Sequence, residues 1–191
     1  MLLILFLLFS LTKALVYWQK PYLLNKRGLL VNALTLAFAL LIARGLGPVL
    51  AVPLELFLPM PGHALDTSYA FYPAELIPDL DTAYFRLAAF CLLLVLALFL
   101  LRRLLKPLLL FFQSETEEKL SRYQAGWAGF YALVDTYLLF FFTLQLLTFI
   151  GQDKLQEYLA SDFWVSGLLF QSPVLSQWTF SFIFEGLAYG L

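Results

Sequence analysis

The sequence predicts an all-α membrane protein with four transmembrane helices, both chain ends outside and interfacial helices near the C-terminal end. The first observation behind this is composition: hydrophobic residues make up 62% of the 191 residues and charged residues 13%, against roughly 45–50% and about 25% in soluble domains. A soluble fold of this size cannot hide so many apolar side chains, because its surface needs polar cover. The composition therefore excludes a secreted disulfide scaffold and most soluble enzymes. We treat residues 1–191 as a single integral membrane domain.

The second observation is that four apolar stretches are long enough to cross a bilayer, which takes about 20 residues at ~1.5 Å each. They lie at about residues 2–18, 28–48, 83–105 and 125–151. No positive residue precedes the first stretch and no A-x-A pattern follows it, so we expect it to remain attached as the first helix rather than to be cleaved as a signal peptide.

The third observation is where the basic residues gather. The connection between helices one and two holds Lys20, Lys26 and Arg27, and the connection between helices three and four holds five more Lys and Arg residues. Residues 49–82 contain no Lys or Arg but carry five acidic residues. Because Lys and Arg collect in cytoplasmic loops, the two basic connections are predicted to be cytoplasmic. The acidic loop 49–82 and both chain ends are then outside.

Prolines divide the two outer segments. Five of them lie in the loop 49–82, which predicts short turns rather than a long helix, with the aromatic residues Tyr69, Phe71 and Tyr72 at headgroup level. Residues 163–184 are free of charge, but Pro173 removes a backbone donor at their middle and disfavours helix at Ser172. We expect two short helices in an outer interfacial segment, residues 152–191; a fifth span is the alternative.

Asp135 is the ionisable residue deepest in the fourth helix, ~15 Å from Ala125 at the helical rise. An unpaired carboxylate near the midplane is costly, and such residues usually have a partner. Lys13 is the basic residue closest to that depth, which predicts an ion pair. In the alternative, Lys13 extends to the cytoplasmic headgroups while a protonated Asp135 bonds to a neighbour such as Tyr131.

Small and polar residues recur at helical spacing on the second helix, which predicts a packing face against a similar stripe on the fourth helix; they are Gly28, Asn32, Thr35, Ala39, Ala43 and Gly47. A lining role for Asn32 is the alternative. Arg44 and Arg86 lie near the outer ends of the second and third helices. They are predicted to form ion pairs with Glu75, Asp79 or Asp81 at this outer rim, and an anion-binding site is the alternative. One cysteine and one histidine cannot build a structural zinc site. We therefore expect no metal, cofactor or catalytic residue.

Several short motifs occur in a characteristic order: Arg27-Gly28 followed by Asn32-Ala33-Leu34-Thr35-Leu36, then Gly126 and Gly129 ahead of Tyr137-Leu138-Leu139-Phe140, then Ser172-Pro173-Val174-Leu175-Ser176. Together with the four-helix layout, this order resembles the colicin V production protein (CvpA) family, over about residues 2–178. The resemblance implies a multi-pass protein of the bacterial inner (plasma) membrane, associated with toxin production or export and envelope homeostasis. It implies no catalytic residue and no reaction.

Three classes of function are compared. A scaffold or accessory subunit for export and envelope maintenance is favoured by the resemblance. An oligomeric channel or transporter of ions or small solutes is favoured by Asp135 and the polar stripe, although matching broken helices are not seen. An intramembrane enzyme lacks a nucleophile or metal motif. The expected partners are the lipid bilayer and either a second copy of the chain or an export or envelope protein. Nucleic acid is not expected as a partner, because the net charge of -1 gives no overall basic surface for its phosphates.

Overall fold

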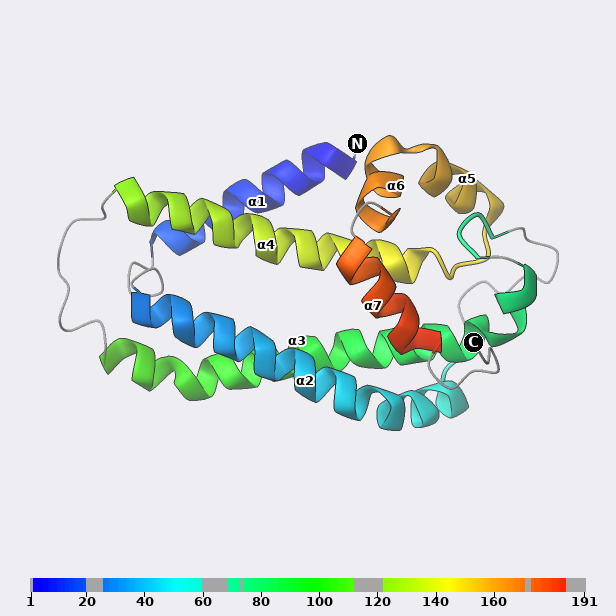
Figure 1. The fold of residues 1–191 in the computed structure, drawn as a ribbon, viewed down its shortest axis with the longest axis horizontal. Helices are drawn as coiled ribbons and strands as arrows, with labels where there is room; N and C mark the ends of the chain where they lie inside the picture. Colours follow the sequence, from blue (N-terminus) through cyan, green and yellow to red (C-terminus); the bar gives the residue numbers. More distant parts are fainter. Residues whose placement is uncertain are drawn as a thin grey trace. The chain divides into compact units, whose positions relative to one another are not determined.

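The computed structural model describes residues 2–19, 26–59, 69–72, 74–111, 122–170 and 173–184, and within these ranges all regular structure is helical. The elements follow one another as shown in Figure 1: α1 (Leu2–Trp18), α2 (Lys26–Phe57), the 3₁₀ helix η2 (Ala74–Asp79), α3 (Leu80–Phe111), α4 (Arg122–Leu147), α5 (Asp153–Ser161), α6 (Phe163–Phe170) and α7 (Pro173–Phe184). The predicted helical class is confirmed.

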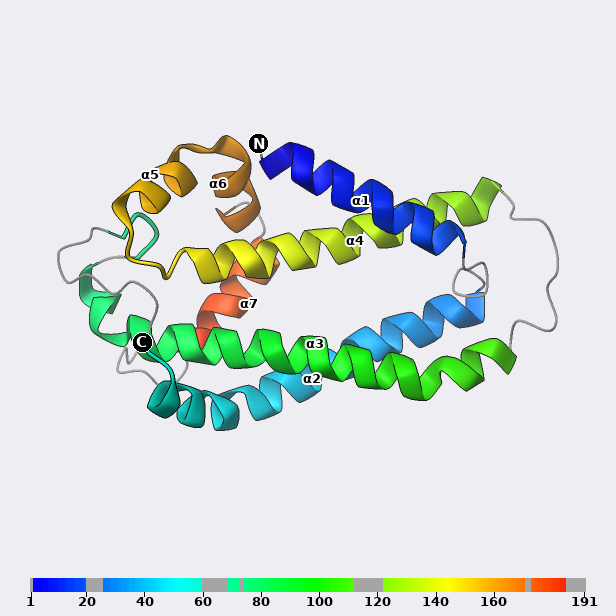
Figure 2. The ribbon, with the colours of Figure 1, turned by 180° about the vertical axis from the view of Figure 1, so that it is seen from behind.

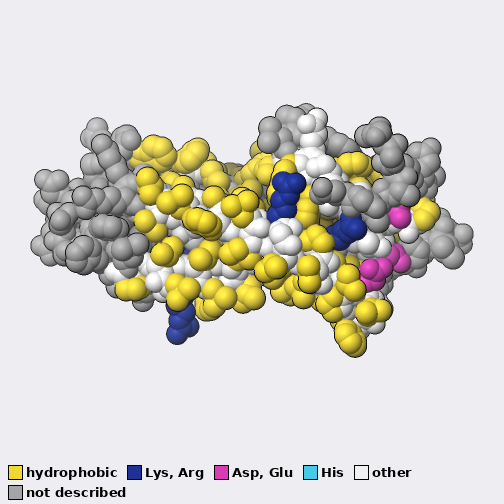
Figure 3. Space-filling view, turned by 60° about the horizontal axis from the view of Figure 1, so that its bottom comes forward, with side chains coloured by type: hydrophobic (Ala, Val, Ile, Leu, Met, Phe, Trp, Pro, Cys, Tyr) yellow, Lys and Arg dark blue, Asp and Glu magenta, His cyan; other side chains and the backbone are white. Residues whose placement is uncertain are grey.

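Three of these helices are long and apolar enough to cross a membrane. The apolar stretches are Leu30–Phe57 in α2, Leu76–Leu105 through α3 and Gly129–Leu147 in α4. Helix α1 has 17 residues, which span ~26 Å and fall short of a ~30 Å hydrocarbon core. Hydrophobic side chains also cover most of the described surface in Figure 3. These helices indicate a membrane-embedded protein, and spanning by α1 stays a prediction.

The chain divides into two compact units, Met1–Ile42 with Leu94–Phe140 and Ala43–Leu93 with Phe141–Leu191. In the first unit, α1 runs beside the first part of α4 (Figures 1 and 2). The ring of Phe140 lies 5.5 Å from that of Phe6 and 6.0 Å from that of Phe9. Tyr17 and Tyr131 make a ring contact at 6.5 Å between the same two helices. Helix α1 is thus held to α4 by aromatic contacts along its length.

The second unit is organised around Phe90 of α3, which is fully buried. Its ring lies 5.3 Å from Phe142 of α4, 5.4 Å from Phe182 and 5.6 Å from Trp178, both of α7. A Cβ added at Gly47 of α2 would lie 3.2 Å from the Phe182 ring. Because the glycine leaves room for these rings, α2, α3 and α7 approach closely here.

Helix α2 continues well beyond its predicted end at residue 48, so the outer loop does not begin at residue 49. Pro48 and Pro53 both lie inside the helix, which ends at Phe57. Ala51, one turn beyond Pro48, is buried in a cluster with Phe85 and Ala89 of α3. This packing stabilises helix where proline alone disfavours it, and prolines are tolerated in membrane helices for similar reasons.

The other long helices also differ from their predicted bounds. Helix α3 begins at Leu80 rather than 83, directly after η2, and runs through Pro107 to Phe111 rather than to 105. Helix α4 begins at Arg122 rather than 125 and ends at Leu147 rather than 151. Hydropathy identifies the apolar stretch rather than the helix, so three of these four bounds fall inside the helices and the predicted end at 151 runs past Leu147.

The part of the outer loop that the structure describes is folded onto the protein. Tyr69 and Tyr72 are each 7% exposed, so these two side chains pack inside the protein, and their position at headgroup level stays a prediction. The hydroxyl of Tyr72 has protein partners, which makes its burial favourable. His63 and Asp66 lie outside the described residues.

The C-terminal segment is divided as the position of Pro173 predicts. Helix α6 ends at Phe170 and α7 begins with Pro173, where a missing N–H costs nothing in the first turn. Asp162 caps α6, accepting a hydrogen bond of 2.9 Å from the backbone N–H of Trp164. Helix α5 was not expected. The segment 163–184 is therefore not one continuous helix, and its interfacial position stays a prediction.

Candidate functional site

Asp135 lies on α4, in the first of the two units. The apolar stretch of α4 begins at Gly129, which places Asp135 about six residues, or ~9 Å, inside it. Its position near the midplane stays a prediction. On α1, Lys13 and Tyr17 are four residues apart and so share one helix face. The aromatic contacts between α1 and α4 turn that face toward Asp135.

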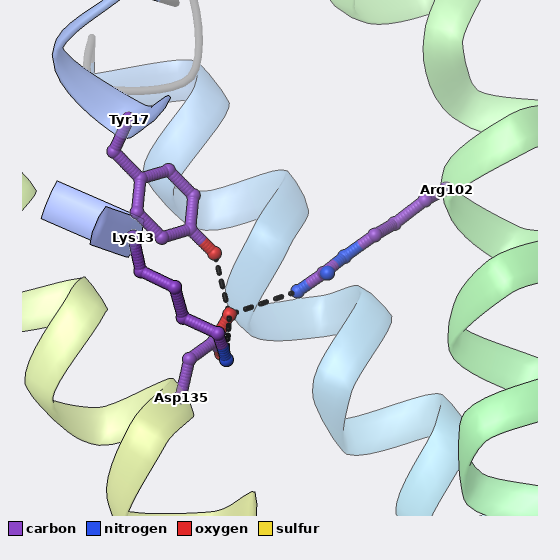
Figure 4. A network of polar contacts seen from close by, with 4 residues as sticks. All are labelled: Lys13, Tyr17, Arg102 and Asp135. Carbon is purple, nitrogen blue, oxygen red and sulfur yellow. Dashed lines mark hydrogen bonds and ion pairs between the residues drawn. The ribbon is translucent and has the colours of Figure 1, made fainter. Parts of the chain in front are cut away.

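Both α1 side chains reach the carboxylate, as Figure 4 shows. The hydroxyl of Tyr17 donates a hydrogen bond of 2.5 Å to Asp135 Oδ2, and Lys13 Nζ lies 3.8 Å from the same oxygen. The structure thus brings together Lys13 and Asp135, as the sequence predicts. Tyr17 is a phenol partner that the sequence argument did not name; Tyr131 was considered only in the alternative with a protonated Asp135.

A third helix contributes a cation that the sequence argument missed. Arg102 of α3 directs its guanidinium at Asp135, with 3.7 Å between Nη2 and Oδ2 (Figure 4). From the sequence, Arg102 was counted with the cytoplasmic connection. The signal that identifies it is its position about three residues inside the end of the apolar stretch at Leu105. The Asp135 carboxylate gives its guanidinium a counterion between the helices.

Two cations therefore face one carboxylate in a site that is open on one side. The side chain of Asp135 is 19% exposed, that of Lys13 32% and that of Arg102 46%. Lys13 and Arg102 are also close enough to repel each other electrostatically. Within the described parts of the chain, the charges leave one positive charge without a counterion. We call Lys13, Tyr17, Arg102 and Asp135 the Asp135 network.

The predicted stripe on α2 is largely buried. Thr35, Ala39 and Ala43 are at most 3% exposed, and Thr35 donates its hydroxyl to the carbonyl of Val31. Asn32 is half-buried on the same helix. Burial of the small residues agrees with a packing face, and a lining role for Asn32 is not tested. Of the predicted stripe on α4 (Ala125, Gly129, Ala132, Thr136 and Thr143), Ala132 and Thr136 are fully buried, whereas a Cβ added at Gly129 would meet open space.

Arg44 and Arg86 contact α7 in the second unit. Arg44 lies over the ring of Trp178, 5.8 Å from its centroid, and Arg86 Nη1 donates a hydrogen bond of 3.1 Å to the carbonyl of Ile183. Asp79 and Asp81 are half-buried where η2 meets α3. Rim ion pairs between these arginines and acids stay a prediction. The contacts to α7 show a second use for the arginines that the sequence did not indicate.

A second polar cluster ties the loop before η2 to the end of α4. Tyr72 Oη lies 2.9 Å from Thr148 Oγ1 and accepts from Gln145 Nε2 at 3.2 Å. Gln156 of α5 donates to the carbonyls of Thr148 and Ile150 and accepts from the N–H of Ala70. Burial raises the pKa of Tyr72, so its hydroxyl stays protonated. The polar groups of this cluster bond to one another, so we assign the cluster a role in stabilising the fold.

The described residues contain no group of three or more His, Cys, Asp and Glu side chains that can hold a metal ion. The chain matches no family model, no curated protein and no solved structure. Its function is therefore inferred from its own residues, and the Asp135 network is the arrangement that most constrains it. Charged residues inside apolar helices are costly and usually have a role in assembly or transport.

Proposed function

We propose that the chain is a multi-pass protein of the bacterial inner membrane that acts as a scaffold or accessory subunit in toxin production or export and envelope maintenance, as the CvpA-like motifs imply. Four apolar helices and the segregation of Lys and Arg into two connections support this placement. In this arrangement α1 to α4 cross the membrane, both chain ends lie outside, and α6 and α7 lie in the outer interface.

The proposal is supported mainly by the contacts of the Asp135 carboxylate. One carboxylate oxygen is engaged by the hydroxyl of Tyr17 and by the cations of Lys13 and Arg102. A carboxylate that carries a cation across a membrane must exchange its ligands, whereas here protein groups from α1 and α3 hold it. Asp135 therefore fixes three helices in one arrangement, which suits a protein that presents a constant surface to partners in the membrane.

An oligomeric channel or transporter is the second candidate. It is favoured by the exposure of the cations, since a third of Lys13 and nearly half of Arg102 remain uncovered. Positive groups that line an aqueous passage attract anions. In this case the solute would be an anion rather than a cation.

Particle mass and ion flux, measured together on the purified full-length chain, distinguish the two candidates. We expect nanodiscs that hold one chain or a small oligomer, and liposomes that release chloride, potassium and protons no faster than empty ones. A ring-shaped oligomer whose chloride conductance falls in a folded Arg102→Gln variant, but not in the matched variant Arg103→Gln, would overturn the scaffold proposal.

A test in cells addresses the scaffold role directly. Deletion of the gene in the source bacterium is expected to raise leakage of a periplasmic enzyme and to lower toxin release. The wild-type gene should restore both, and Asp135→Asn should restore them only as far as the chain accumulates in the membrane. An intact envelope and unchanged toxin release after deletion would contradict the proposal.

A further inference from the structure

The Asp135 network contains two cations and one carboxylate. Lys13 and Arg102 both face Asp135, and within the described residues this carboxylate is their ion-pair partner. A single carboxylate neutralises one of the two charges. An excess charge among apolar helices is unfavourable unless a counterion is near.

The distances show that the cations have donors to spare. The N–O separations of 3.8 Å for Lys13 and 3.7 Å for Arg102 exceed the 2.7–3.2 Å usual for a hydrogen bond. Asp135 Oδ2 instead takes its short hydrogen bond from Tyr17. A guanidinium has five N–H donors and a lysine ammonium three, so most of these donors remain for another acceptor.

The depth of the network selects the kind of anion. Arg102 lies ~5 Å and Asp135 ~9 Å inside the ends of their apolar stretches, next to the basic connections. Long basic side chains at this depth reach the level of lipid headgroups. Basic pockets between helices on the cytoplasmic side are known to bind phospholipid phosphates, and Arg matches a phosphate with two parallel hydrogen bonds.

We propose that Arg102 and Lys13 bind the phosphate of an anionic phospholipid of the cytoplasmic leaflet, on the open side of the Asp135 network. The headgroup supplies the counterion that Asp135 provides in part, and the acyl chains lie along the exposed apolar residues of α1 and α3. The inference requires that the chain lies in a membrane, but not that it acts as a scaffold.

Binding is tested on the delipidated full chain in neutral detergent. Native mass spectrometry would count the lipids retained from phosphatidylglycerol or from phosphatidylcholine, and thermal unfolding would report stabilisation by each. We expect selective retention of phosphatidylglycerol, and roughly fivefold weaker binding in Arg102→Gln. Arg103→Gln is the matched control, because Arg103 is an exposed neighbour on the same helix and should leave selectivity unchanged.

Asp135→Asn provides a test in the opposite direction. Removing the competing carboxylate frees both cations, so this variant should bind phosphatidylglycerol more tightly than the wild type, even if it unfolds at a lower temperature. A site in which Asp135 only maintains structure predicts weaker binding instead. The lipid affinity of Asp135→Asn still tests the proposal if the Arg102→Gln variant does not fold.

The proposal would be overturned by equal retention of the two lipids, by equal losses in the Arg102 and Arg103 variants, or by weaker binding in Asp135→Asn. Stabilisation by inorganic phosphate equal to that by phosphatidylglycerol would show that the site takes a soluble anion instead. If a second copy of the chain covers the open side of the Asp135 network instead of a lipid, the mass spectrum would show a dimer without retained lipid. That result would also contradict the proposal. None of these outcomes depends on flux or on toxin release.

Discussion

Replacing Asp135 with asparagine is the perturbation that most directly tests the network. Asparagine keeps the size of the side chain and removes its charge. The change leaves Lys13 and Arg102 facing each other without an anion, and it weakens the hydrogen bond from Tyr17, which now meets a neutral acceptor. Replacing either cation is a smaller change, because the carboxylate keeps the other one.

The magnitude follows from the distances and the exposure. At about 4 Å and an effective dielectric constant of ~20, one ion pair is worth ~4 kcal/mol before screening and desolvation. Breaking a fully buried pair costs ~3–5 kcal/mol, and an exposed pair contributes ~0–1 kcal/mol. Since Asp135 is mostly covered and the cations are one third to one half exposed, Asp135→Asn should lower the free energy of unfolding by about 2–3 kcal/mol. Lys13→Met and Arg102→Gln should each cost about 1 kcal/mol.

The free energy of unfolding is measured by denaturant titration in mixed micelles, with tryptophan fluorescence as the signal. The decisive comparison is a double-mutant cycle. In the Asp135→Asn background, Lys13→Met should be neutral or stabilising, because it removes an uncompensated cation. Strictly additive losses would show that the two residues do not interact. An Asp135→Asn loss no larger than that of Lys13→Met would refute the central position of Asp135.

Three further predictions concern topology and packing. In a background without the native cysteine, a cysteine placed at Ser68 should react with an impermeant thiol reagent on intact cells while one at Ser121 should not, and the reverse pattern would contradict the orientation. Gly47→Leu should lower the free energy of unfolding by about 1–3 kcal/mol, because the added side chain meets aromatic rings. Gly45→Leu is the control, because open space surrounds Gly45, and it should not destabilise. Equal melting temperatures of the two variants would argue against the close approach of α2 to α3 and α7. Tyr72→Phe should cost about 1–3 kcal/mol, because it removes the acceptor of Gln145 Nε2 and one of the two hydrogen bonds of the Thr148 hydroxyl. An unchanged unfolding midpoint would show that water replaces the hydroxyl.

The helix limits show where sequence periodicity stops being informative. Pro48 and Pro53 argue locally for a helix end, yet α2 continues to Phe57 because Ala51 is buried against α3. Pro173 does divide its segment, where polar neighbours on both sides already weaken the helix. A proline's effect is thus decided by the packing around it, which hydropathy does not contain.

The sequence by itself determined the helical membrane class and the approximate positions of the three long apolar helices, and it favoured the pairing of Lys13 with Asp135 that the structure shows. These depend on transfer free energies and on the cost of an unpaired charge, both of which are properties of local composition and depth. Only the tertiary structure decided that Tyr17 and Arg102 join the same carboxylate oxygen and that Tyr72 is buried. These features depend on the rotation of each helix about its axis. That rotation is set by contacts between residues distant in the chain, such as Phe140 with Phe6, which no local pattern specifies.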